Sequence, residues 1–516
     1  MMDDRPPGLP GQFNNIPPLS AFRLSLHDVR ILSITMVDYS KYETVIGLEV
    51  HAQLLTESKL FCADSAAFGG APNTHISPIT LGYPGTLPML NKKAVEYAIK
   101  LGLACHCTIE HNNYFARKNY FYPDLPKGYQ VSQHTAPICV GGYVKIQTEQ
   151  GEGAVQLNRI HMEEDAGKSI HDLDEHFTMV DFNRAGVPLV EIVTEPVIHS
   201  AEEAYAYLTE LRRLVRYLGV CDGNMEEGSM RCDANISVRL HGETTLGTKV
   251  EVKNMNSIRN VKRAIEYEVK RQIDIIESGG TFIQETRSFD AATGGSFSLR
   301  SKEEANDYRY FPEPDLAPFH FTEAYIAGIR ATLPALPEEL MAHYTTQLGL
   351  SEYDARVICD DKSISDYYEQ LIQATPLYKA AANWLQGPVK SWLNEHGGDM
   401  AAFPIPAIAL ASLITLADEG KVSFSVAVKS IFPELLQHPT EAPLDIATRL
   451  NILQEKDAGS IAPIVDEVLA SLPAKVAEFK AGKKGLMALF VGEVMKRSKG
   501  KADPKLTNAL LAEKLK

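Results

Sequence analysis

The chain has 516 residues, 45% hydrophobic and 23% charged, which is the composition of a soluble globular protein with roughly two to four domains. No apolar run reaches the ~18 residues that a bilayer span requires, and seven cysteines without regular spacing exclude a disulfide framework and favour a reducing compartment. The net charge of −15 disfavours broad affinity for nucleic acid.

Residues 1–38 form an extension with early acids, many prolines and no long apolar run. These features fit neither a signal peptide nor a transit peptide, and we expect a disordered segment. Met36, shortly before the first clear strand, is an alternative start of translation.

The first clear strand is "VIGLEVHAQL", residues 45–54. Its alternation predicts one buried side, made by Ile46, Leu48 and Val50, and one side that carries Glu49 and His51. Further along, "ARKNYFYPDLPKGYQVSQ" (116–133) combines rigid aromatic and basic side chains, among them Lys118 and Tyr120. We favour a binding lid there over a buried connection.

Four later segments repeat this arrangement of reactive side chains. "RIHMEEDAGKS" groups Glu163, Glu164 and Asp165, and "NRAGVPLVEIVTEP" places Glu191, Val193 and Glu195 on one side of a strand. "EGSMRCDANISVR" and "TKVEVKNMNS" alternate buried residues with charged or amide ones. Their polar members are Arg231, Asp233, Asn235, Ser237, Arg239, Lys249, Glu251 and Lys253.

Two helices interrupt these strands, and each has a stripe of apolar residues that we expect to be core. The first begins at Ser200 with Glu203 three residues later, a capping box, and ends at Gly219. The second ends at Gly279 and Gly280. The two stripes are Tyr205, Leu208, Leu211, Val215 and Leu218, and Ile258, Val261, Ile265, Val269, Ile273 and Ile276.

An α+β fold follows from this order of elements: an antiparallel-sheet-rich cradle domain over 39–325, an all-helical domain over 331–435 and a helical tail domain over 436–516. "PEPDLAPF" and "FPELLQHPTEAP" mark the two breaks. The tail is basic, with Lys496, Arg497, Lys499 and Lys501. It is either a solvated, frayed terminus or a contact for a polyanion.

The clustered acids have two interpretations. An antiparallel sheet with one wet face is common, but carboxylates that converge repel one another unless a cation lies between them. We therefore favour a site for Mg²⁺ and phosphate over a solvent-exposed polar surface that binds no ligand. "EDAGKS" is not a phosphate-binding loop of the Walker type, because Met162 stands where that motif needs glycine.

The motifs "GLEVHAQL", "RKNYFYPDLPKGYQ", "HMEEDAGKS", "NRAGVPLVEIVTEP", "EGSMRCDANISVR", "KVEVKNMNS" and "RSKEEANDYRYFPEPDL" together resemble the B-subunit family of aspartyl/glutamyl-tRNA amidotransferases. The resemblance implies a cytoplasmic, bacterial-type heterotrimer with an amidase partner, a small third component, and no membrane. It implies that the chain uses ATP and Mg²⁺ to phosphorylate the side-chain carboxylate of Glu-tRNA(Gln), Asp-tRNA(Asn) or both. Ammonia from glutamine then displaces the phosphate.

Residue roles follow from the resemblance in the same way. Glu49, His51, Glu164 and Glu191 match positions associated with the metal, which we expect them to bind in one pocket. Glu163, Asp165 and Asp233 are expected to hold metal through water or to orient ligands. Candidates for phosphate, ATP or acyl-group contacts are Lys118, Tyr120, Arg231, Asn235, Lys253 and Asn254. The basic tail, with the four cations named above, is expected to bind tRNA.

The sequence differs from the family at one set of positions that could hold a structural zinc. Many relatives carry four cysteines after the first strand, whereas this chain has Cys62, Asp64, Ser77 and Thr80 at those positions. We therefore expect no structural zinc and a loop held by packing and turns. Two rival functions stay open: a non-catalytic scaffold that presents tRNA to the amidase without using ATP, and a free-standing ATP-dependent ligase that uses ammonia directly.

Overall fold

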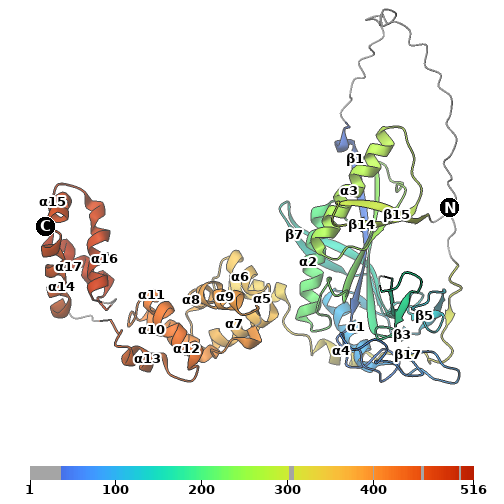
Figure 1. Ribbon diagram of the computed structural model, residues 1–516, viewed down its shortest axis with the longest axis horizontal. Coiled ribbons are helices and arrows are strands. Elements are labelled where there is room, and N and C mark those ends of the chain that lie inside the picture. Colours follow the sequence, from blue (N-terminus) through green and yellow to red (C-terminus); the bar gives the residue numbers. More distant parts are fainter. Residues whose placement is uncertain (1–36, 172, 302–306, 399, 455–457, 499–500) are drawn as a thin grey trace, which may run out of the picture.

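The structure is a computed structural model that describes residues 37–171, 173–301, 307–398, 400–454, 458–498 and 501–516. The extension predicted over residues 1–38 lies outside this part of the chain, apart from Val37 and Asp38. In Figure 1 a large sheet with flanking helices makes up the first part of the chain, and a series of helices extends away from it. The fold is α+β, as the sequence predicts.

The strands are β1 (Tyr42–Gln53), β2 (Thr108–Ile109), β3 (Asn112–Asn113), β4 (Ala116–Asn119), β5 (Tyr129–Ser132), β6 (Cys139–Val140), β7 (Tyr143–Thr148), β8 (Gly151–Glu164), β9 (Lys168–Ile170), β10 (Met179–Asp181), β11 (Pro188–Thr194), β12 (Met230–Leu240), β13 (Val250–Lys253), β14 (Glu285–Asp290), β15 (Gly295–Ser301), β16 (Phe311–Pro312) and β17 (Phe319–His320). Over the described residues thirteen of them form one sheet with the order β15-β14-β13-β12-β1-β11-β8-β5-β4-β16, to which β2, β6 and β7 are joined. The other four form two separate pairs, β9 with β10 and β3 with β17. The pairs are antiparallel except β13 and β14, which run parallel.

The helices are α1 (Lys92–Ala104), α2 (Ala201–Tyr217), α3 (Ile258–Glu277), α4 (Glu323–Arg330), α5 (Pro337–Thr346), α6 (Glu352–Ile358), α7 (Lys362–Ala374), α8 (Tyr378–Trp384), α9 (Lys390–Glu395), α10 (Ala407–Asp418), α11 (Phe424–Val426), α12 (Phe432–Gln437), α13 (Pro443–Arg449), α14 (Ala458–Ser471), α15 (Pro473–Lys480), α16 (Met487–Arg497) and α17 (Pro504–Lys514). No helix in the described part of the chain has the length and hydropathy needed to cross a lipid bilayer.

The apolar side of the sheet lies under α2 and α3 (Figure 1). Ile46, Leu48 and Val50 of β1 are fully buried there, which confirms the alternation read from the sequence. The neighbouring strands β12 and β13 bury the alternating set Met230, Cys232, Ala234, Ile236, Val250 and Val252. The side chains that point the other way from these strands form the polar side of the sheet.

The two helices begin and end where their sequence signals predict, but part of each stripe is not core. The Ser200 hydroxyl accepts a hydrogen bond from the amide of Glu203, and Gly219 follows α2 with a φ of +64°. Tyr205, predicted to be buried, is 44% exposed, and Tyr207 takes its place in the core. Ile276, near the end of α3, is also exposed.

The loop after β1 contains the four positions at which relatives have cysteines. The Thr80 hydroxyl donates to Asp64, and the Cys62 sulfur lies 3.4 Å from the same hydroxyl. Burial raises the pKa of the Asp64 carboxyl, but hydrogen bonding, first of all with Thr80, outweighs it and lowers the pKa. Three of the four side chains, Cys62, Asp64 and Thr80, therefore contact one another, and every cysteine of the chain is free.

Beyond the sheet the described helices enclose two further cores. The first runs from Tyr344 to Ala447 and so includes α13, beyond the break predicted near residue 435; the second runs from Ile461 to Leu515. The domain boundaries themselves stay predictions.

Asp354 ties three elements of the first helical core together. Its carboxylate accepts hydrogen bonds from Ser351 and Lys379, and a 3.0 Å bond from Gln386. Burial raises the pKa of this carboxyl, but the hydrogen bonds with Lys379, Ser351 and Gln386 lower it to about 2. The stabilisation is therefore present above pH ~4, the pKa of the unfolded chain, and is lost as the pH falls towards 2.

Replacing Asp354 with asparagine is expected to lower the free energy of unfolding of this core by about 1–3 kcal/mol at pH 7. Urea denaturation at pH 7 and at pH 3 measures it, with the exposed Asp366→Asn as control. The difference between Asp354→Asn and the unaltered chain should shrink at pH 3. An equal difference at both pH values would contradict the assignment.

Candidate functional site

The polar side of the sheet brings reactive side chains from four adjacent strands into one row. His51 of β1 lies opposite Arg231 of β12 on one side and opposite Glu191 of β11 on the other. Glu191 in turn lies opposite His161 of β8. Residues that are directly opposite on antiparallel strands share a face with their Cβ atoms about 5 Å apart. The register thus aligns an arginine, two histidines and a carboxylate across the sheet.

Three side chains converge on one point of this face, and we call them the histidine–glutamate cluster: His51, Glu163 and Glu191. The His51 Nε2 atom lies 3.6 Å from Glu163 Oε1 and 3.7 Å from Glu191 Oε2. One possible ligand atom from each residue lies within 4.8 Å of the others. All three are buried or half-buried, so a bound cation would be partly shielded from water.

His161 lies under the two carboxylates of this cluster and is fully buried. Its Nε2 atom is 3.2 Å from Glu191 Oε2 and 3.7 Å from Glu163 Oε2. Burial lowers the pKa of His161, but hydrogen bonds to Glu163 and Glu191 outweigh this and raise the pKa to about 9. Burial likewise raises the pKa of Glu191, yet the contacts with His161 and His51 hold it well below its usual value. Glu191 is therefore ionised at neutral pH.

A second group, the acidic cluster, consists of Glu49, Asp233 and Glu251 on β1, β12 and β13. Burial raises the pKa of Glu49, and the charges of Glu191, Asp233 and Glu251 act in the same direction. Lys253 contacts two members of the cluster: its ammonium donates to Asp233 and lies 3.0 Å from Glu251 Oε1. The acidic cluster thus carries its own cation.

Arg231 is held in place by Asp165. Its guanidinium nitrogen lies 2.9 Å from Asp165 Oδ2, which also accepts a 2.7 Å hydrogen bond from Gln53. Burial raises the pKa of Asp165, but the nearby Arg231 and Arg184 outweigh it and keep the pKa low. Asp165 is consequently a charged anchor that orients Arg231.

Glu164 lies apart from the metal-site candidates. On β8 it is opposite Pro188 while Glu163 is opposite Leu189, and successive side chains of a strand point to opposite faces. Both Glu164 oxygens accept hydrogen bonds from Lys127, at 2.6 and 2.7 Å. Of the four residues expected around one metal, the structure brings His51 and Glu191 together, puts Glu49 in the adjoining acidic cluster and leaves Glu164 with Lys127.

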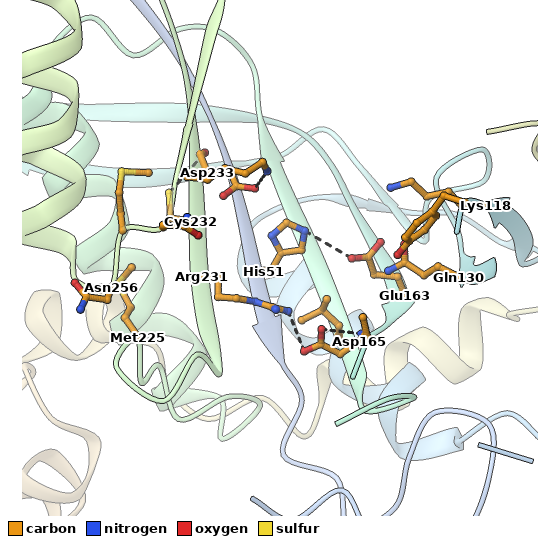
Figure 2. Close-up of a pocket in the computed structure, with 16 residues that line it drawn as sticks. His51, Lys118, Gln130, Glu163, Asp165, Met225, Arg231, Cys232, Asp233 and Asn256 are labelled. Carbon is orange, nitrogen blue, oxygen red and sulfur yellow. Dashed lines mark hydrogen bonds and ion pairs between the residues drawn. The ribbon is translucent and has the colours of Figure 1, made fainter. Parts of the chain in front are cut away.

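A cavity of about 590 Å³ opens beside these groups, and of the histidine–glutamate cluster His51 and Glu163 line it while Glu191 does not. Figure 2 shows His51, Arg231 and Asp165 in its middle, Met225 and Asn256 at one end, and Lys118 and Gln130 at the other. Among the residues named in advance, the lining also includes Tyr120, Glu163, Asp233, Lys253 and Asn254.

Asn235 and Asn254 have structural partners. The Asn235 amide donates to Glu49 at 2.9 Å, and Asn235 is not among the described residues that line the cavity. Asn254, in the left-handed region with a φ of +65°, donates to Ser288 at 2.9 Å.

The four basic residues of the tail lie between residues 496 and 501, far in the sequence from the residues that line the cavity. Lys496 and Arg497 end α16, and Arg497 contacts Glu467 at 3.2 Å. Lys501 precedes α17, and Lys499 lies outside the described residues.

Sequence reasoning did not single out His161, Arg159 or Glu251. The sequence pattern could have identified two of them. His161 and Arg159 precede Glu163 by two and four residues, so the three side chains share one face of the strand. Glu251 was recognised as part of a polar side but was given no role, since only the pairing of β13 with β12 brings it to Asp233.

The donor set of the histidine–glutamate cluster suits a divalent cation. Two carboxylates and one imidazole supply oxygen and nitrogen ligands of the kind that Mg²⁺ and Mn²⁺ accept, and further positions would be filled by water or phosphate. Each cluster has a cationic group against its carboxylates, His161 in the first and Lys253 in the second. The acidic cluster is less suited because only Asp233 of its three members lines the cavity, whereas His51 and Glu163 both do.

Comparison with known proteins gives two family matches. Residues 44–327 match the model of the GatB/GatE catalytic domain, and residues 366–515 match that of the GatB domain. Two similar curated proteins are the B subunits of the aspartyl/glutamyl-tRNA(Asn/Gln) amidotransferases of Syntrophotalea carbinolica, 49% identical over 476 residues, and Geobacter sulfurreducens, 50% identical over 478 residues. In both comparisons the match covers 92% of this chain and 99% of the relative.

Proposed function

Because this chain belongs to the B-subunit family of aspartyl/glutamyl-tRNA(Asn/Gln) amidotransferases, we propose that it activates the side-chain carboxylate of a mischarged aminoacyl-tRNA. The substrate is Glu-tRNA(Gln), Asp-tRNA(Asn) or both. ATP phosphorylates the carboxylate, and ammonia released from glutamine by a partner amidase then converts it to the amide. A small third component of the complex and a cytoplasmic location belong to the same proposal.

The observation that carries this proposal is the composition of the cavity. It places two members of the histidine–glutamate cluster, His51 and Glu163, beside Arg231 and Lys253, so that metal-binding and cationic groups face the same space. Phosphoryl transfer asks a protein mainly to position its substrates and to neutralise charge. Cys232 is also a lining residue, but its side chain belongs to the buried apolar set of β12, and burial raises the pKa of its thiol well above the usual value, which makes it a poor nucleophile.

The chemistry explains why phosphate is needed. A carboxylate is a poor acyl donor, because attack by ammonia would have to expel oxide. Transfer of the terminal phosphoryl group of ATP to a carboxylate oxygen makes an acyl phosphate and releases ADP. Ammonia then attacks the acyl carbon, the C–O bond to phosphate breaks, and the products are the amide and inorganic phosphate after loss of a proton.

The residues divide this work between them. His51, Glu163 and Glu191 would hold a divalent cation, which when bound neutralises phosphate charge. Arg231, oriented by Asp165, and Lys253, oriented by Asp233 and Glu251, supply positive charge for phosphate oxygens. The half-buried position of these groups limits access of water, which would hydrolyse an acyl phosphate.

The test is amide formation on Glu-tRNA(Gln) by the reconstituted complex with glutamine and ATP. We expect one ATP to be consumed per amide formed and no amide without ATP. A non-catalytic scaffold predicts that this chain neither binds nor consumes ATP. A free-standing ligase predicts turnover at low ammonia without the other components, so either result would replace the proposal.

The basic tail is proposed to bind tRNA through phosphate contacts. Changing Lys496 and Lys501 to glutamine is expected to weaken tRNA binding and to reduce the slope of log K against log salt by about 1 to 2, because fewer counterions are released. Filter binding at several salt concentrations measures this. Lys92→Gln with Lys93→Gln, on exposed α1 positions, is the matched control. An unchanged slope would remove the tail from the interface.

A further inference from the structure

Four aromatic rings form a row beside the histidine–glutamate cluster, and we call them the aromatic wall: Tyr120, Tyr308, Tyr310 and His134. The Tyr120 and Tyr308 rings are 6.1 Å apart, as are Tyr308 and Tyr310. His134 stacks on Tyr310 at 5.1 Å with an angle of 12° between the rings. The wall thus combines side chains from the β4–β5 region with a segment almost 200 residues later in the chain.

Specific contacts hold the two parts of the wall together. The backbone amide of Asn119 donates to the Tyr308 carbonyl at 3.0 Å, and its side-chain amide donates to the Arg309 carbonyl at 2.8 Å. Arg309 adopts a φ of +45°, an unfavourable conformation that these bonds maintain. Just beyond, Arg117 makes two hydrogen bonds to Glu313, at 2.6 and 2.7 Å. The rings are therefore in place before any ligand binds.

The wall reaches the candidate active site at both ends. Tyr120 lines the cavity directly, and the His134 ring lies 5.9 Å from that of His161, which contacts both cluster carboxylates. A cation flanks each end: Lys118 lies 5.6 Å from the centre of the Tyr120 ring, and Arg159 lies 3.3 Å from His134 Nδ1. Aromatic rings flanked by cations suit a planar group with a phosphate beside it.

The three tyrosines of the wall are partly exposed, although His134 covers one face of the Tyr310 ring. Tyr120, Tyr308 and Tyr310 are half-buried, and their hydroxyls make no hydrogen bond within the described part of the chain. Aromatic side chains that border a positively charged groove bind unpaired nucleobases by stacking. A row of tyrosines with flanking cations has the composition of such a platform.

Two substrates of the proposed reaction carry an adenine base, namely ATP and the 3′ end of the aminoacyl-tRNA. Two cations suited to a polyphosphate line the cavity away from Lys118: Arg231 lies in its middle, and Lys253 donates to Asp233 (Figure 2). Lys118 lies at the other end and contacts the Tyr120 and Tyr308 rings of the wall. The carboxylate to be activated must meet the terminal phosphate between these ends. An aminoacyl-tRNA that enters from the side of the aromatic wall brings its aminoacyl group to the histidine–glutamate cluster from the end of the cavity opposite to ATP.

We propose that the aromatic wall binds the 3′-terminal adenine of the aminoacyl-tRNA by stacking, and so delivers the esterified amino acid to the histidine–glutamate cluster. This inference rests on the proposed function, because it takes an aminoacyl-tRNA as the substrate. It assigns a base-binding role to Tyr308 and Tyr310.

The experiment uses the reconstituted complex with Glu-tRNA(Gln), ATP and glutamine, and measures kcat/KM for the tRNA and, separately, KM for ATP. Tyr310→Leu and Tyr308→Leu should each lower kcat/KM for Glu-tRNA(Gln) about tenfold and leave KM for ATP within about twofold. Tyr310→Phe and Tyr308→Phe keep the ring and should restore kcat/KM, which a role through the hydroxyl would not allow. Tyr205→Leu, an exposed tyrosine on α2, is the control.

Two results would overturn the assignment: leucine variants that leave kcat/KM for the tRNA unchanged, or variants that raise KM for ATP alone. Thermal unfolding of each variant separates lost stacking from lost structure, because a leucine variant that disrupts the wall would have a lower melting temperature than the matching phenylalanine variant. The unaltered complex distinguishes the two proposals. Absence of amide there would refute the proposed function, whereas amide there with unaffected leucine variants refutes the aromatic wall alone.

Discussion

Replacing Glu163 with glutamine is expected to reduce ATP-dependent amide formation about 100- to 1000-fold, the range seen when a group that stabilises transition-state charge is removed. The substitution keeps the shape of the side chain but removes its charge, so that only two good donors, His51 and Glu191, remain. Phosphate release and amide yield from Glu-tRNA(Gln), measured in the complex at saturating ATP, provide the readout.

Glu164→Gln is the informative comparison, because the two residues are adjacent and chemically identical. It should lower the rate much less, since Glu164 contacts Lys127 on the other side of the strand. Glu195→Gln, whose carboxylate bonds to Asn158, is the control outside the cavity. If Glu164→Gln abolished turnover and Glu163→Gln did not, the assignment of the metal to Glu163 would be wrong.

The second large effect is expected for Lys253→Met. Without the ammonium, Glu49, Asp233 and Glu251 would lie within 4.8 Å of one another with no cation between them. We expect KM for ATP to rise at least tenfold and the free energy of unfolding to fall by about 1–3 kcal/mol, between the values for surface and buried ion pairs.

Lys253→Arg should recover part of both losses because it keeps the charge, and Lys362→Met, which removes an exposed i,i+4 pair, is the control. Steady-state kinetics and urea denaturation measure the two quantities. A Lys253→Met variant with unchanged KM for ATP would show that this lysine serves only to hold the acidic cluster together.

The alternation of side chains predicted the buried side of β1 correctly, because Ile46, Leu48 and Val50 leave only one way to orient that strand. It could not choose between Glu163 and Glu164. In "MEED" both faces of the strand carry an acid, so the register with β11 is needed to decide which one faces His51.

Contacts between segments that are distant in the sequence could not be predicted either, because they also depend on how the strands pair. Lys253 meets Asp233 and Glu251 only because β13 pairs with β12, and Tyr308 joins Tyr120 only because Asn119 binds the backbone nearly 200 residues away. In α2 the 3.6-residue period located the helix but misplaced one ring, since Tyr205 and Tyr207 both lie near the edge of the apolar stripe and packing selected Tyr207.

The most direct test of the account is the binding of Mn²⁺ to the full chain, followed by electron paramagnetic resonance of the free ion. The unaltered chain and Glu164→Gln should each bind one Mn²⁺ tightly, while Glu163→Gln and Glu191→Gln should bind it at least tenfold more weakly, since each loses a carboxylate ligand. Equal Mn²⁺ affinity in all four proteins would contradict a cation site at His51, Glu163 and Glu191.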